Sequence, residues 1–113
     1  MTPLLAAIIA IESGGNDYAR GRHGEVGPLQ VRASVVRDVN RIYRTRYTLQ
    51  QMTNRAAACD VFERYMRIYA TRCALGRPVT DYDRARIWHR GPGGWRTDRS
   101  DYAQRVVAIE TSR

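Results

Sequence analysis

The sequence contains no lysine, and all nineteen of its cationic side chains are arginine. The glycines of GPGG, residues 91–94, therefore lack the lysine of a phosphate-binding loop, and neither a serine nor an expected strand accompanies them. The sequence also has no HExxH and no CxxC pattern, and its two histidines, His23 and His89, lie far apart. These absences argue against a phosphate loop and a metal site, and we expect no cofactor.

Cysteine is scarce, since Cys59 and Cys73 are the only two. Both fall in what the hydrophobic pattern predicts as one helix, which would place them about 21 Å apart. A disulfide needs α-carbons within roughly 7 Å of each other. We therefore expect two reduced, buried thiols, which do not define the cellular compartment.

Long hydrophobic runs are also missing. The apolar stretch at residues 4–11 stops at Glu12, far short of membrane-spanning length, and no positively charged segment precedes it. We expect no membrane span and no export signal. If the protein acts outside a cytoplasm, another process must release it, or the sequence is a trimmed domain.

Positive charge is abundant. The formal net charge is +8 and the isoelectric point is near 10.3. Such a surface would attract anionic polymers, either nucleic acid or a bacterial cell wall with its teichoic acids and peptide carboxylates. The alternative is a solvated surface whose arginine bias reflects codon usage.

The length of 113 residues fits a single domain over residues 1–113, and a hydrophobic content of 43% is ordinary for a globular protein. Thr2 and Pro3 open a predicted helix over residues 3–13, which Gly14 ends. Residues 14–32 contain five glycines and one proline. This composition predicts a glycine-rich loop after the first helix, with room for a short β-hairpin.

Hydrophobic periodicity and capping residues predict further helical segments. Apolar side chains at three- and four-residue steps predict a long central helix over residues 54–75. The shorter segments are a helix capped by Ser34, a turn opened by Thr48 and Gln51, a helix over 81–90 between Thr80 and Gly91, and a helix over 101–110 capped by Ser100. The sequence therefore predicts a mainly α domain.

Glu12 stands at the end of the first helix. Leu4, Ile8 and Glu12 fall at four-residue steps, so the carboxylate extends the apolar stripe to the edge of the core. Partial burial and the negative end of the helix dipole both disfavour its ionised form, so we expect a raised pKa. Such an acid can protonate the leaving group in glycoside cleavage. The alternative is a solvated glutamate at a helix end.

The segment GEVGPLQV, residues 24–31, adds a second carboxylate, Glu25. Its glycines permit a tight loop, Leu29 and Val31 can anchor that loop, and Gln30 presents an amide. Glycosidic hydrolysis commonly uses two carboxylates, one as acid and the other as nucleophile, base or electrostatic stabiliser. The alternative for Glu25 is an exposed loop glutamate.

Four segments occur in the order ESGGN, GEVGPLQV, IWHRGPGGW and DYAQRV. Together they resemble the signature of the lysozyme-like superfamily, most closely its lytic transglycosylase (SLT) and goose-type lysozyme branch. In that branch a helix ends in Glu-Ser-Gly, a Gly-Leu-Met-Gln-like loop and an Ala-Tyr-Asn-x-Gly-Pro-Gly-like segment follow, and the last helix carries a tyrosine. The resemblance spans nearly the whole chain and implies a lysozyme-like helical fold.

The resemblance also implies residue roles on the first helix and its loop. Glu12 matches the catalytic acid, which in lytic transglycosylases also acts as the base. Ser13 and Gln30 match positions that line the sugar cleft. Glu25 aligns with a catalytic aspartate of chicken-type lysozymes.

Three more residues match in the second half of the chain. Trp88 and His89 stand where the family has Tyr-Asn, and Tyr102 matches the tyrosine that holds the catalytic glutamate. Trp88 and Trp95 are also candidates to offer a flat face to a sugar ring, the alternative being that Trp88 is a core residue and Trp95 a loop anchor. His89 departs from the family's asparagine and has a structural histidine as its alternative.

The function implied is that of a muramidase cutting the β-1,4 bond between N-acetylmuramic acid and N-acetylglucosamine in peptidoglycan, by hydrolysis or transglycosylation. We expect a monomer acting on the bacterial wall, phage-encoded and released from the cytoplasm or virion-associated. The alternative is a non-catalytic basic module, either a lysozyme fold that only binds wall polymer or a nucleic-acid binder. The nucleic-acid contacts would be Arg37, Arg41, Arg44 and Arg46, but this hypothesis leaves the ordered motifs unexplained.

Overall fold

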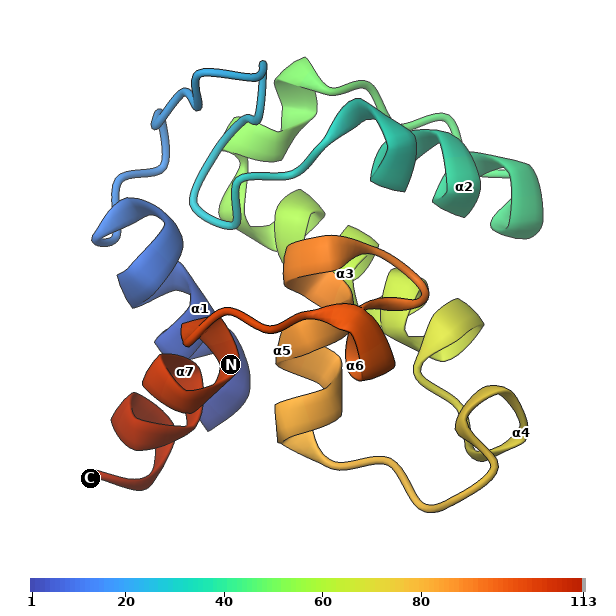
Figure 1. The fold of residues 1–113 in the computed structure, drawn as a ribbon. Helices are drawn as coiled ribbons and strands as arrows, with labels where there is room; N and C mark the ends of the chain where they lie inside the picture. Colours follow the sequence, from blue (N-terminus) through green and yellow to red (C-terminus); the bar gives the residue numbers. More distant parts are fainter. Residues whose placement is uncertain (113) are drawn as a thin grey trace. The chain divides into compact units, whose positions relative to one another are not determined.

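Helices make up most of the chain, as a computed structural model of residues 1–112 shows (Figure 1). The mainly α prediction is therefore confirmed. In chain order the elements are α1 (Pro3–Ser13), α2 (Ala33–Tyr43), the 3-10 helix η1 (Gln50–Thr53), α3 (Arg55–Tyr69), α4 (Arg72–Leu75), α5 (Asp81–Arg90), α6 (Gly94–Thr97) and α7 (Tyr102–Thr111). In this part of the chain no helix is both long enough and apolar enough to cross a bilayer.

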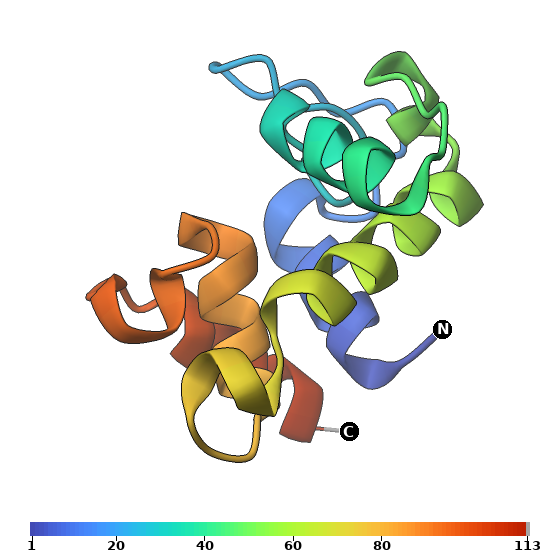
Figure 2. The same ribbon diagram turned by 90° about the vertical axis from the view of Figure 1, so that its right-hand side faces the viewer.

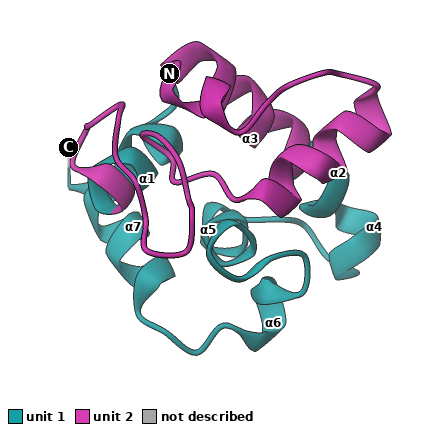
Figure 3. Ribbon diagram, turned by 90° about the horizontal axis from the view of Figure 1, so that it is seen from above, with its two compact units in different colours: residues 1–11, 66–113 teal, residues 12–65 magenta. Residues whose placement is uncertain are grey.

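The chain divides into two compact units (Figure 3). Unit 1 contains residues 1–11 and 66–113, and unit 2 contains residues 12–65. Helices α1 and α3 each contribute residues to both units. A single domain over residues 1–113 stays a prediction.

Helix α1 begins and ends where the sequence predicted. Thr2 Oγ1 accepts a hydrogen bond from the backbone N–H of Leu5 (3.2 Å), and Gly14 follows the helix with a left-handed φ of 61°. Most of its apolar side chains are buried: Leu4, Leu5, Ala7, Ile8 and Ile9.

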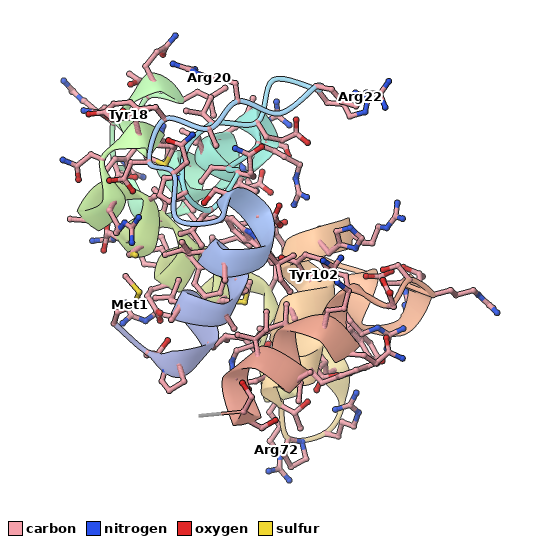
Figure 4. The ribbon with its side chains drawn as sticks, turned by 90° about the vertical axis from the view of Figure 1, so that its left-hand side faces the viewer. Met1, Tyr18, Arg20, Arg22, Arg72 and Tyr102 are labelled. Carbon is pink, nitrogen blue, oxygen red and sulfur yellow. The ribbon has the colours of Figure 1, made fainter. Side chains whose placement is uncertain are left out.

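The predicted loop between α1 and α2 contains no strand. Two isolated antiparallel bridges, Arg20 with Val26 and Val26 with Val31, take the place of a hairpin. Val26, Leu29 and Val31 are buried and anchor the loop, as predicted for the last two. Figure 4 shows Arg22 at the outer tip of this loop, directed away from the helices.

Of the two helix caps predicted in unit 2, one is wrong and the other is confirmed. Ser34 lies inside α2, which begins at Ala33 with Arg32 as its N-cap, so the predicted Ser34 cap is wrong. The pair Thr48 and Gln51 does form a reciprocal capping box: Thr48 N donates to Gln51 Oε1 (2.8 Å) and Gln51 N donates to Thr48 Oγ1 (3.3 Å).

The predicted continuous helix over residues 54–75 is wrong, because the chain breaks between α3 and α4. Thr71 is extended, with φ −123° and ψ 152°, and its hydroxyl accepts from Ala74 N (3.1 Å) as an N-cap for a new helix. Cys59 and Cys73 consequently lie on different helices, α3 and α4. Both are free thiols, but Cys59 is only half-buried and Cys73 is exposed, so the prediction of two buried thiols is also wrong.

In unit 1, α5 packs against both α6 and α7, and Figure 2 shows α5 and α6 side by side. A capping box opens α5: Asp83 N donates to Thr80 Oγ1, and Thr80 N donates to Asp83 Oδ2. Arg77 forms a bidentate pair with the same buried carboxylate, at 2.7 Å on both oxygens. The start of α5 is therefore tied to the preceding loop.

Candidate functional site

The seven predicted site residues fall into two groups. One group lies in unit 2 and comprises Glu12, Ser13, Glu25 and Gln30, and the other lies in unit 1 and comprises Trp88, His89 and Tyr102. Within residues 1–112, no three His, Cys, Asp or Glu side chains gather in a way that could hold a metal ion.

Glu12 lies on the last turn of α1 and is half-buried. It follows Ile8, which is fully buried, by one helical repeat, so the carboxylate stands at the margin of an apolar stripe. Its position near the C-terminal end of the helix also exposes it to the negative pole of the helix dipole. The raised pKa predicted for Glu12 from the sequence depended on these two features.

Ser13 fastens the end of α1 to the GEVGPLQV loop. Its Oγ donates to the carbonyl of Pro28 (2.8 Å) and accepts from Gly15 N (3.2 Å). At the start of the loop, Arg55 donates to Asp17 Oδ1 from Nε (2.8 Å) and to the Gly15 carbonyl from Nη2 (2.8 Å). The residues after Glu12 are therefore held by side chains from distant parts of the unit.

Gln30 has a backbone φ of 52°, and its side chain turns back into the loop. Its Nε2 donates to the carbonyls of Ala19 (3.1 Å) and Gly27 (3.0 Å). Both amide hydrogens therefore brace the loop from within, a role that the sequence did not predict. Its Oε1 lies beside Gly21, where a Cβ would stand only 2.7 Å from it.

Glu25 lies against the same face of Gly21, since its Oε1 would stand 2.3 Å from a Cβ there. The pKa of its carboxyl is lowered, chiefly because its own backbone N–H donates to it, while partial burial opposes the shift. The backbone N–H of His23, at 2.9 Å from Oε1, and the nearby charges of His23 and Arg32 lower the pKa further. Glu25 is therefore suited to act as an anion rather than as a proton donor.

In unit 1, His89 on α5 is held by Asp98. Nδ1 of His89 lies 2.9 Å from Oδ2 of Asp98, whose side chain is 1% exposed. Burial acts to raise the pKa of Asp98, but hydrogen bonds from His89 and Ser100 outweigh it and lower the pKa to about 2. Because the carboxylate is ionised, Nδ1 carries a proton, which fixes the orientation of the ring.

Ser100 completes this network without forming a nucleophilic triad. Its backbone N–H and its Oγ both donate to Asp98 Oδ1, at 2.9 and 2.7 Å. Its Oγ lies 3.3 Å from the same His89 nitrogen, Nδ1, that faces the carboxylate. A histidine that activates a serine uses its other ring nitrogen for that purpose. The network therefore orients His89 rather than activating Ser100.

Trp88 and Tyr102 are both largely buried, at 2% and 5% exposure. The placement of Trp88 favours the alternative that it is a core residue. Tyr102 stacks on the His89 ring, so it supports the one polar side chain of this group that reaches solvent.

Asp98 is the functional candidate that the sequence did not single out. It lies nine residues beyond His89 and meets it because α6 folds back along α5. The carbonyls of Trp95 and Asp98 both accept from Arg86 on α5, which closes this turn. The signal in the sequence is the short D-R-S segment, in which an aspartate accepts from a backbone N–H two residues later, as turn-forming aspartates do.

Neither a scan against protein-family models nor a search of curated proteins gave a match to this chain.

Proposed function

We propose that this chain is a muramidase that cleaves the β-1,4 bond between N-acetylmuramic acid and N-acetylglucosamine in peptidoglycan. The observation that carries the proposal is the placement of Glu12, a half-buried carboxyl on the last turn of an apolar helix, beside a loop that Ser13 and Gln30 brace. This placement suits a general acid, because partial desolvation and the helix dipole both favour its protonated form.

In the proposed reaction, protonated Glu12 donates its proton to the bridging oxygen as the bond to C1 of the muramic acid breaks. In a transglycosylase, the resulting carboxylate takes the proton of the sugar's own C6 hydroxyl, whose oxygen attacks C1 and leaves a 1,6-anhydro end. In a hydrolase, water attacks C1 and the product is a reducing sugar. The lowered pKa of Glu25 suits it to stabilise positive charge at C1 or to orient that water.

His89, Trp88 and Tyr102 enter the proposal through the resemblance. We assign His89 to substrate contact, since Asp98 fixes its ring and it is half-exposed, and Tyr102 to its support. Trp88 supports the core beneath them.

The test is digestion of purified peptidoglycan by the wild type, by Glu12→Gln and by Glu63→Gln, with soluble muropeptides identified by mass spectrometry. Glu63→Gln is the matched control, because it neutralises a half-buried glutamate of the same unit on α3. We expect the wild type and Glu63→Gln to release product and Glu12→Gln to release at least about a hundredfold less, the scale of general-acid catalysis. Anhydro ends would identify a transglycosylase and reducing ends a hydrolase.

The competing hypothesis is a basic module that binds without cleaving. Its support is the exposure of Arg37, Arg41, Arg44 and Arg46. Absence of soluble product from the wild type, on walls of several chemotypes, would favour this hypothesis and reject the muramidase.

A further inference from the structure

A row of arginines follows α2 into the loop beyond it. Arg37 and Arg41 are four residues apart on the helix, Arg44 is its C-cap and Arg46 follows two residues later. All four are exposed, and Asp38 is the only carboxylate among residues 33–51. Asp38 lies 3.8 Å from Arg41, and no ion pair joins the other three arginines to a carboxylate within residues 1–112.

The loop that carries Arg44 and Arg46 is ordered by Asn40. The Oδ1 of Asn40 accepts from Thr45 Oγ1 (2.8 Å) and from Tyr47 N (3.0 Å), and its Nδ2 donates to the Tyr47 carbonyl (2.9 Å). Thr45 and Tyr47 are therefore turned inward, and the intervening Arg46 is turned outward. This arrangement orders the backbone that carries Arg44 and Arg46 before any ligand arrives, which reduces the ordering cost of binding.

A shallow hollow of about 250 Å³ lies beside this loop, lined by Thr45, Arg46, Tyr47 and Gln51. Tyr47 forms its wall in a fixed position, because its hydroxyl donates to Asp60 Oδ2. Asp60 also accepts from Arg64 Nε (2.9 Å), so its negative charge is paired. The hollow combines an aromatic wall with a guanidinium and an amide, a lining suited to a small polyol that carries an anionic group.

We propose that Arg37, Arg41, Arg44 and Arg46, with this hollow, form a binding surface for a wall polymer of polyols joined by phosphodiesters. Each phosphate of such a polymer can accept hydrogen bonds from arginine in a bidentate manner, and the row offers four guanidiniums for such contacts. The hollow accommodates a polyol between two phosphates. The choice of a wall polymer over nucleic acid rests on the proposed muramidase function.

The aromatic side chains beside the arginine row, Tyr43 and Tyr47, are only partly exposed, which leaves little ring face for the base stacking that single-stranded nucleic acid binders use. The large apolar or aromatic side chains that are strongly exposed in the described residues are Met1, Tyr18 and Ile42, and only Ile42 belongs to the segment with the arginine row. Base stacking therefore has few exposed rings to use here, whereas phosphate binding has four guanidiniums.

The test measures binding of a purified glycerol-phosphate polymer by calorimetry over a series of salt concentrations. All proteins carry Glu12→Gln, so that cleavage does not enter. Arg44→Gln with Arg46→Gln is compared with Arg67→Gln with Arg105→Gln, which removes the same charge from exposed positions outside unit 2. Circular dichroism verifies that each protein is folded.

We expect the Arg44 and Arg46 substitutions to weaken binding about tenfold at low salt and to make its salt dependence shallower, because two phosphate contacts are lost. The control pair should weaken it less than about threefold. Equal weakening by both pairs would mean diffuse attraction and overturn the proposal. No binding of the polymer, or tighter binding of duplex DNA at equal phosphate concentration, would overturn it as well.

The polymer-binding proposal and the muramidase proposal are tested by separate measurements. Polymer binding by the Glu12→Gln protein is measured without catalysis, and muropeptide release is measured on peptidoglycan stripped of phosphate polymers. Failure of one experiment therefore leaves the outcome of the other intact.

Discussion

The imidazole of His89 lies flat against the phenol ring of Tyr102, with the ring centroids 4.2 Å apart and an angle of 7° between their planes. Asp98 fixes the edge of the same imidazole through Nδ1. One half-exposed side chain is thus held on its face by a ring and on its edge by a buried carboxylate.

We expect Asp98→Asn to lower the free energy of unfolding by about 1–3 kcal/mol, because His89 and Ser100 lose their charged acceptor in a buried setting. Urea denaturation followed by circular dichroism measures this. Asp101→Asn is the control, since Asp101 is exposed and its side chain caps nothing, and it should change stability by less than about 0.5 kcal/mol. Equal effects of the two substitutions would contradict a structural role for Asp98.

We expect Gly27→Ala to be strongly destabilising, by about 3 kcal/mol or more. Gly27 has φ +87°, and an added Cβ would stand 1.9 Å from the Met52 carbonyl oxygen, which is backbone and has no rotamer to escape into. Thermal unfolding measures the loss.

Gly24→Ala separates the cost of the positive φ from the cost of the close approach to Met52. Gly24 has almost the same φ, +86°, but an added Cβ there meets nothing within 4 Å. We therefore expect only the cost of the backbone conformation, about 1 kcal/mol. A loss at Gly24 as large as that at Gly27 would show that the close approach to Met52 contributes nothing.

Acid should destabilise unit 1 between about pH 4 and pH 2. The hydrogen bonds from Arg77 lower the pKa of Asp83 from its ordinary 3.8 to about 2. The hydrogen bonds from His89 and Ser100 likewise outweigh burial and lower the pKa of Asp98 from 3.8 to about 2. A lowered pKa in the folded state stabilises the protein above the unfolded pKa, and this stability is lost as pH falls through the folded value. Unfolding measured from pH 5 to pH 2 should show the loss, and Asp83→Asn should make it smaller.

Glu110 on α7 should make stability fall as pH rises, the opposite of the effect of Asp83 and Asp98. A hydrogen bond with Asp81 raises its pKa to about 7, with burial and the charge of Asp81 adding to the shift. A raised pKa stabilises the folded state fully below the unfolded value of 4.5, and this contribution is lost as pH rises through about 7. We expect Glu110→Gln to flatten the pH dependence of the melting temperature between pH 5 and pH 8. An unchanged pH dependence would contradict the raised pKa of Glu110.

The sequence predicted those elements whose ends depend on local chemistry. Thr2 and Pro3 before α1, Gly14 after it, and Thr80 before α5 act through neighbours within four residues, so their effects are visible in the sequence. The hydrophobic stripe of α1 likewise gave the burial of Ile8 and the partial burial of Glu12.

Two predictions about the ends of helices were wrong at residues that carry a hydroxyl group. Thr71 looked like one more residue of a long helix, but α3 ends at Tyr69 and the Thr71 hydroxyl caps α4. Ser100 looked like a helix cap, and its Oγ does accept from Tyr102 N at 3.3 Å, yet its shorter bond is to Asp98. Both contacts are local, three residues apart for Thr71 with Ala74 and two for Ser100 with Asp98, so these errors came from choosing between local alternatives.

Only part of the candidate site could be predicted from the sequence. Glu12 and Glu25 belong to motifs, whereas the Asp98 contact with His89 requires the α6 turn, which residues 91–97 gave no reason to expect as a helix. Gln30 was expected to line the sugar cleft, which stays a prediction, and the structure adds that its amide hydrogens brace the loop.

The loop between α1 and α2 is tightly packed at one place and exposed at another. Gly27 fits against Met52 with no space to spare, whereas Arg22, His23 and Gly24 at the tip are exposed. Among homologous chains we expect insertions and deletions to accumulate at the tip, while the position of Gly27 admits no other residue. The loop is thus a place where lineages can diverge in length without disturbing the backbone around Gln30.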